Sequence, residues 1–176
     1  MVVFRPCDGV ETAECWELAL KRSHGPSVMA LTRQTVKSVR KTHTDENLSA
    51  RGGYILSEAD GELKAVLIAT GSEVEIAMAA QDRLRAEGIA VRVVSMPSME
   101  VFAEQGRDWH AHVLGAPGTP RVVVEAGVRF GWDRWLGERG AFVGMTGFGA
   151  SAPYKTLYEH FGITPEAAMA AVRALV

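Results

Sequence analysis

The sequence predicts an α/β fold from about residue 52 to 176, with a mostly parallel sheet between layers of helices. Short apolar runs at 65–69 and 89–94, rich in β-branched residues, enclose one helix-length segment and so predict a strand–helix–strand unit. A third run of the same character, RVVVE at 121–125, predicts a further parallel strand. Neither of the first two runs alternates strongly with polar residues, so other elements are expected to cover both faces of the sheet.

The helix of this unit carries signals at both ends. Ser72 is followed three residues later by Glu75, which predicts a capping box in which each side chain bonds a free backbone N–H. Gly88 marks the end of the helix, because glycine tolerates the left-handed conformation after a last turn. The apolar residues at helical spacing are Val74, Ala77, Met78 and Leu84. A right-handed crossover is expected between the two strands.

The segment before residue 52 predicts a smaller and separate unit. A strand end at 2–4 precedes a helix at 11–22 and a buried strand, SVMALT, at 27–32. The next stretch, 34–53, is polar and basic and has no sustained period, which is typical of a linker. The domain boundary is therefore expected in this stretch.

After the boundary, Tyr54–Ser57 is predicted to begin a hairpin and to run antiparallel to its neighbour, because a short turn at Asp60-Gly61 follows. Ser151 is expected to cap a helix that ends at His160, and Pro165 takes the first position of the last helix, which ends at Leu175. The other predicted elements are short helices at 97–105, 108–114 and 131–136 and a strand at 141–144.

The composition excludes several classes of protein. With 47% apolar and 23% charged residues, the 176-residue chain is expected to bury a core. Its net charge of -2 argues against nucleic acid as a partner. No apolar run approaches the roughly 20 residues that span a bilayer, so no membrane partner is expected. Cys7 and Cys15 are too few for a disulfide framework, which favours a reduced cytoplasmic setting and a role as small core residues.

Two glycine-containing loops are candidates for ligand contact. Thr70-Gly71-Ser72 precedes a helix, where a phosphate can bind to free N–H groups. Glu73 and Glu75 already occupy the positive end of that helix dipole, so a purely structural cap is favoured. The glycine-rich stretch 144–151 also precedes a helix, but a lone glycine pattern is weak evidence and tight backbone packing is favoured there.

Histidines and aromatic residues give weaker indications. His110 and His112 face opposite sides of a predicted helix, which disfavours a shared metal ion. Nothing in the sequence brings a serine, a histidine and an acid together as a triad. The aromatic residues of one short stretch are Phe130, Trp132 and Trp135. Core packing is the favoured interpretation for them, and a subunit or domain interface is the second.

Arg33 stands apart because it directly follows a predicted strand. Side chains at that place in α/β folds often contact ligands, and the planar guanidinium suits phosphate. From the pattern alone, a surface salt bridge is still favoured.

Six blocks taken together resemble the carboxyl-terminal part of transketolase and cover nearly the whole chain in family order. They read GPSVMALTRQT, ARGGYIL, ATGSEVEIAMAA, VRVVSMPS, VVVEAG and GMTGFGASAPYKTLYEHFGIT. The resemblance implies that 1–35 is the tail of the pyrimidine-binding domain, 36–51 a linker and 52–176 the C-terminal domain. It also implies a three-layer α/β/α fold with a mixed, mostly parallel five-stranded sheet whose first strand is antiparallel.

The same resemblance implies transfer of a two-carbon ketol unit between sugar phosphates, a reaction of the pentose phosphate pathway, in a homodimeric parent enzyme. Thiamine diphosphate and a divalent cation, Mg or Ca, would be the cofactors. One site residue carries over: Leu31-Thr32-Arg33-Gln34 resembles the family's Leu-Ser-Arg-Gln motif, whose arginine binds the substrate phosphate. Thr32 replaces the usual serine conservatively, and Thr35 replaces the common asparagine. No catalytic, cofactor-binding or metal-binding residue carries over.

The family's diphosphate and metal motif, a Gly-Asp-Gly run with a downstream asparagine, does not occur in this sequence. We therefore expect a fragment or subunit that is inactive alone and that needs the rest of the polypeptide or a complementary N-terminal subunit. The alternatives are a stand-alone binding or regulatory module, a structural domain that supports a dimer, and the corresponding domain of deoxyxylulose-phosphate synthase or a 2-oxo acid dehydrogenase.

Overall fold

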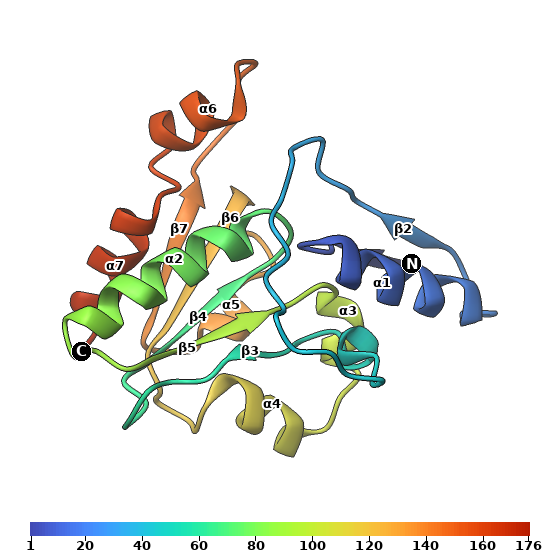
Figure 1. Cartoon of the computed structure of the whole chain (residues 1–176), viewed down its shortest axis with the longest axis horizontal. Coiled ribbons are helices and arrows are strands. Elements are labelled where there is room, and N and C mark those ends of the chain that lie inside the picture. Colours follow the sequence, from blue (N-terminus) through green and yellow to red (C-terminus); the bar gives the residue numbers. More distant parts are fainter.

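The computed structural model describes all of residues 1–176, and its centre is a five-stranded sheet with the order β3-β5-β4-β6-β7 (Figure 1). β3 is antiparallel to β5, and the other strands are parallel to their neighbours. The strands are β3 (Tyr54–Ser57), β4 (Ala65–Ala69), β5 (Val91–Ser95), β6 (Arg121–Val128) and β7 (Gly140–Met145). The predicted fold class, a mixed and mostly parallel five-stranded sheet, is confirmed.

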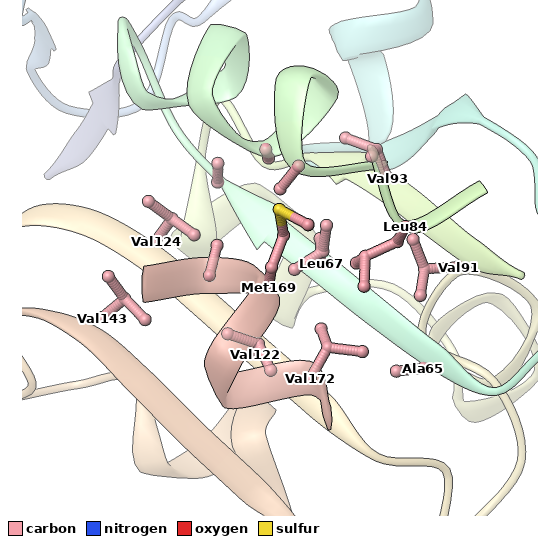
Figure 2. Packing of buried hydrophobic residues seen from close by; sticks show 14 of the residues in the cluster. Ala65, Leu67, Leu84, Val91, Val93, Val122, Val124, Val143, Met169 and Val172 are labelled. Carbon is pink, nitrogen blue, oxygen red and sulfur yellow. The ribbon is translucent and has the colours of Figure 1, made fainter. Parts of the chain in front are cut away.

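Helices cover both faces of the sheet, as the apolar strands predicted. On one face, α2 (Glu73–Ala86) and α7 (Pro165–Arg173) pack on a cluster that includes Leu67. Figure 2 shows Leu67 and Met169 close together inside this cluster. On the other face, Val66 and Ile68 of the same strand pack in a second cluster. The helices there are α3 (Met99–Ala103), α4 (Arg107–Leu114) and α5 (Asp133–Leu136).

The first 51 residues form a smaller unit beside the main sheet (Figure 1). β1 (Val2–Phe4) and β2 (Ser27–Met29) make a separate two-stranded parallel sheet. The helix α1 (Gly9–Lys21) lies between these strands in the chain, and a 3₁₀ helix, η1 (Leu48–Arg51), precedes β3. The prediction that 27–32 is a buried strand is wrong in two respects. It ends at Met29, and its residues are only half-buried or exposed, because β1 is its only partner strand.

Three local predictions are wrong. Although β3 is antiparallel, it pairs with β5 and not with β4, because β5 and β6 occupy the two edges of β4. Ser72 does not cap α2: its backbone is already helical, and its hydroxyl donates to Glu73 instead. Ser151 lies outside α6 (Tyr154–His160), whose cap position is Pro153.

Other side-chain predictions are confirmed or corrected by burial. Cys7 and Cys15 are buried free thiols, as expected of small core residues. Trp132 and Trp135 lie in the second cluster, as core packing predicted, but Phe130 is 91% exposed in the loop after β6. No helix has both the length and the apolar content that crossing a membrane requires.

Candidate functional site

The carboxyl edge of the sheet has a topological switch point between β4 and β6. The chain leaves β4 through α2 toward β5 on one face, and leaves β6 through α5 toward β7 on the other face. Loops that diverge in this way open a crevice where α/β proteins bind ligands. A cavity of about 370 Å³ lies here, and it is lined by loop 70–73, by the end of β6, by α6 and by the N-terminal unit.

Glu125, at the end of the buried part of β6, is the most deeply buried acid of the cavity. Its side chain accepts a hydrogen bond of 2.9 Å from the Thr70 hydroxyl and forms an ion pair with Arg5. Burial raises the pKa of Glu125 to about 7, and the negative charge of Glu73 adds to this effect, while the Arg5 guanidinium opposes it. The carboxyl group is therefore held close to its titration point at neutral pH.

Glu73, the first residue of α2, is a second buried acid at the cavity, only 4% exposed. It accepts hydrogen bonds from the Ser72 hydroxyl at 2.8 Å and from the Tyr158 hydroxyl of α6. Burial, followed by the charge of Glu73, raises the pKa of Tyr158 to about 12, so this phenol stays protonated as a donor. The Gln34 amide donates a long bond of 3.5 Å to the Tyr158 oxygen from across the cavity.

Arg5 joins the N-terminal unit to three strand ends of the main sheet. Its backbone N–H donates to Pro97 O, beyond the end of β5, at 2.7 Å, and its carbonyl accepts from Gly71 N, after β4, at 3.0 Å. Its guanidinium reaches Glu125 in β6. The residue that follows β1 is thus fixed by both backbone groups and by its side chain.

The chemistry of these groups does not fit a diphosphate. Two carboxylates, Glu73 and Glu125, and one guanidinium, Arg5, line the cavity, and Glu73 stands at the positive end of α2 where an anion would bind. No three His, Cys, Asp or Glu side chains are grouped so that they could hold a metal ion. We therefore assign no part in holding thiamine diphosphate or its cation to the residues of this cavity.

Arg33 lies at the apex of a turn beside the cavity. The turn is closed by a 3.1 Å bond from the backbone N–H of Gln34 to the Thr32 hydroxyl. Leu31, Thr32 and Gln34 line the cavity, whereas Arg33 does not line it and points its charge at no acid within ion-pair distance. The salt-bridge interpretation of Arg33 is therefore wrong. The guanidinium is exposed and available.

The structure brings some of the other candidates to the cavity and leaves others elsewhere. Gly149 of the glycine-rich stretch and Thr70-Gly71-Ser72 line it. His110 instead bonds Phe102 O at 2.7 Å and packs on Trp135, away from the cavity, whereas the His112 ring packs on Trp109. The sequence reasoning missed Glu125. Its signal was of the same kind as that of Arg33, a charged residue directly after a run of residues predicted to form a strand.

Comparison with known proteins gives the family. The model of the transketolase-like TK C-terminal domain matches residues 52–164. The transketolase of Rhodobacter capsulatus is 55% identical over 98% of this chain and 26% of its own length. The chain therefore spans about a quarter of the length of the curated relatives it matches.

Solved structures agree with this match. The transketolase of Leishmania mexicana is 41% identical with a TM-score of 0.87, over 99% of this chain and 25% of that one. The Pichia stipitis transketolase in complex with sedoheptulose-7-phosphate is 31% identical with a TM-score of 0.88, and the match covers 99% of this chain and 25% of that one. A split-gene transketolase, described as an inactive β4 tetramer, is 27% identical with a TM-score of 0.79, and the match covers 99% of this chain and 57% of that one. The chain belongs to the transketolase family and corresponds to the carboxyl-terminal portion of its members.

Proposed function

We propose that this chain is the carboxyl-terminal part, or a subunit, of a transketolase that transfers a two-carbon ketol unit between sugar phosphates. The observation that carries the proposal is 55% identity to one transketolase over 98% of the chain. The Pichia stipitis enzyme has been solved with fructose-6-phosphate, sedoheptulose-7-phosphate and xylulose-5-phosphate, which supports phosphorylated ketoses as substrates here. These matches favour a transketolase over deoxyxylulose-phosphate synthase or a 2-oxo acid dehydrogenase.

The proposal includes a division of the chain into three parts. Residues 1–35 are the tail of the pyrimidine-binding domain, 36–51 a linker and 52–176 the C-terminal domain. Two features support this division: β1 and β2 form a sheet of their own, and no strand or α-helix lies between residues 30 and 47. On this proposal, the other strands of the pyrimidine-binding domain are contributed by the remaining three quarters of the parent enzyme.

Arg33 is the proposed ligand of the substrate phosphate. Its guanidinium is exposed and forms no ion pair, so no protein carboxylate competes with an incoming phosphate. The planar fork of arginine matches the oxygens of a phosphate with two parallel hydrogen bonds. The turn closed by Thr32 and Gln34 presents this side chain outward.

Thiamine diphosphate and a divalent cation, such as magnesium, would bind to the rest of the parent enzyme. The parent is proposed to act as a cytoplasmic homodimer, and this chain alone is proposed to be inactive. The cavity supports the proposal that this chain alone is inactive, because its two carboxylates do not suit the diphosphate of the cofactor. The split-gene transketolase is a precedent for a related chain that is inactive by itself.

A coupled assay with thiamine diphosphate and magnesium tests the proposal. The purified chain should give no turnover of xylulose-5-phosphate. The same chain joined behind the part of the Rhodobacter capsulatus transketolase that precedes the matched region should be active, and Arg33→Ala should raise its KM for phosphorylated substrates. Turnover by the chain alone, or a folded but inactive fusion, would contradict the proposal.

A further inference from the structure

The path from the main sheet to Arg33 is short and runs through Arg5. Phe4, the residue before Arg5, is in register with Met29, and its carbonyl accepts from Ala30 N at 2.8 Å. Three residues further along the chain is Arg33. The Arg33 turn is therefore joined to β1, and Arg5 ties β1 to the ends of the main strands. Two weaker contacts add to this: Val3 N donates to Glu100 at 3.3 Å, and the Gln34 amide donates to Tyr158 at 3.5 Å.

The contact between Arg5 and Glu125 has features that a chance surface ion pair lacks. The Glu125 side chain is only 2% exposed, and its second oxygen is already bonded to Thr70. Exposed ion pairs contribute little, but a buried carboxylate depends on its cation, because leaving it unpaired is costly. Arg5 thus has one favourable place for its side chain, and the two backbone bonds of the same residue hold it there.

We propose that Arg5 and Glu125 are positioning residues for Arg33, and that their ion pair fixes the turn that presents Arg33 to the substrate phosphate. This inference rests on the proposed role of Arg33. A guanidinium that binds a phosphate with two parallel bonds depends on its placement, and displacements of about 1 Å in such groups have large kinetic effects. Neither Arg5 nor Glu125 touches the substrate in this proposal.

The proposal predicts a signature that a general loss of stability does not give. A displaced Arg33 weakens only the binding of a phosphate group, so the effect depends on whether the sugar carries one. Substrates without phosphate bind through other parts of the enzyme and are unaffected. The matched pair is D-xylulose 5-phosphate and D-xylulose, assayed with the unphosphorylated acceptor glycolaldehyde.

The first experiment uses the fusion to the amino-terminal part of the Rhodobacter capsulatus enzyme. Arg5→Met should raise the KM for D-xylulose 5-phosphate about tenfold, while kcat and the KM for D-xylulose change less than about twofold. In the same variant, the inhibition constant of inorganic phosphate should rise by the same factor as the KM for D-xylulose 5-phosphate. Glu125→Gln should act in the same direction, and Arg5→Lys should restore part of the loss. The control is Arg173→Met, which removes an exposed arginine paired with Glu87, at the end of α2 opposite to Glu73.

A double-mutant cycle shows whether Arg5 acts through Arg33. In the Arg33→Ala background, Arg5→Met should produce no further rise in KM for D-xylulose 5-phosphate, since the group it positions is gone. Additive effects, or equal rises in KM for the two sugars, would overturn the inference. An inactive wild-type fusion would count against the proposed function instead.

A second measurement needs no activity and uses the 176-residue chain itself. Hydrogen exchange of the segment 30–36 should be faster in Arg5→Met than in the wild type, and unchanged in Arg173→Met. Equal exchange in all three proteins would show that the ion pair does not hold the turn, and the inference would be wrong whatever the fusion does.

Discussion

Glu125 is a single residue whose protonation is coupled to folding. Its pKa is raised from about 4.5 to about 7 by burial, so the folded chain holds this proton more tightly than the unfolded chain. The stability that the protonated group contributes is fully present below about pH 4.5 and is lost as the pH rises through about 7. We expect the free energy of unfolding of the wild type, relative to Glu125→Gln, to fall by about 3 kcal/mol across this interval.

Urea denaturation of both proteins at pH values from 4.5 to 8 measures this difference. A difference that stays level, or that grows toward high pH, would show that the Arg5 ion pair outweighs burial. The comparison between the two proteins removes the contributions of acids that do not interact with Glu125.

Two glycines with similar backbone angles allow a matched test of packing. Gly52 has φ +76°, and a Cβ there would lie 2.2 Å from Phe102 N. Gly88 has φ +78°, with open space around its Cα. Gly88→Ala should cost about 1 kcal/mol of stability for the left-handed backbone alone, whereas Gly52→Ala should cost about 3 kcal/mol or more, because backbone atoms must also move. Chemical denaturation measures both, and equal costs would contradict the close approach of η1 to α3.

For single residues, the sequence indicates what kind of role a side chain has more reliably than it indicates which residue the side chain contacts. Arg33 was picked out by its place after a strand, and its turn lies beside the cavity, but the predicted salt bridge has no acid to form it. Ser72 carried the right signal for a cap, yet its backbone is helical and its hydroxyl bonds to Glu73. Tyr158, which is 85 residues away from Glu73 in the sequence, also donates to it. Partners so remote in the chain are fixed by tertiary packing, which no local pattern records.

Among the elements, the amino-terminal ends of α6 and α7 differ in the structure and give a direct comparison. The Thr164 hydroxyl accepts from Ala167 N at 3.2 Å and caps α7, whereas Ser151 is exposed and lies outside α6. Thr164→Ala should lower the free energy of unfolding by about 1 kcal/mol, and Ser151→Ala should change it by less than about 0.5 kcal/mol. Thermal or urea unfolding measures both, and a larger cost at Ser151 would indicate that it caps α6 after all.

The strands also show which elements a sequence can predict. β4, β5 and β6 were recognised because both faces of their central residues are buried, so each strand contains a run of apolar residues. The partner strand of β3 was not recognised. Tyr54 pairs with Ser95, which lies 41 positions further along the chain, beyond an intervening strand and helix. A short loop indicated a hairpin, but the central position of β4 between two parallel neighbours excludes it.

For the molecule as a whole, Glu11 ties the N-terminal unit to the C-terminal domain. This fully buried carboxyl group of α1 accepts from the Tyr54 hydroxyl at 2.7 Å, from the Ser95 hydroxyl at 2.6 Å and from Cys7 N at 2.7 Å. Burial raises the pKa of Glu11, and these three donors oppose that rise. The sequence placed a domain boundary between these partners, and only the structure shows that buried polar contacts cross it.

The outer face of the N-terminal unit leads to the last prediction. Leu20 of α1 is 78% exposed, and Trp16 and Val28 are also exposed, although all three are large apolar side chains. If residues 1–35 complete a pyrimidine-binding domain, this face is covered by the rest of the parent enzyme. Leu20→Lys should then leave the stability of the 176-residue chain within about 0.5 kcal/mol, since the side chain is already in water.

The same substitution should weaken binding of a separately expressed amino-terminal polypeptide about tenfold or more, because burying a leucine side chain stabilises by roughly 1.5–3 kcal/mol. Titration calorimetry of the two polypeptides measures this affinity. Val176→Lys, at an exposed position far from α1 in the sequence, is the control and should bind like the wild type. Equal affinities for all three chains would place the partner on another face and would separate residues 1–35 from the proposed domain.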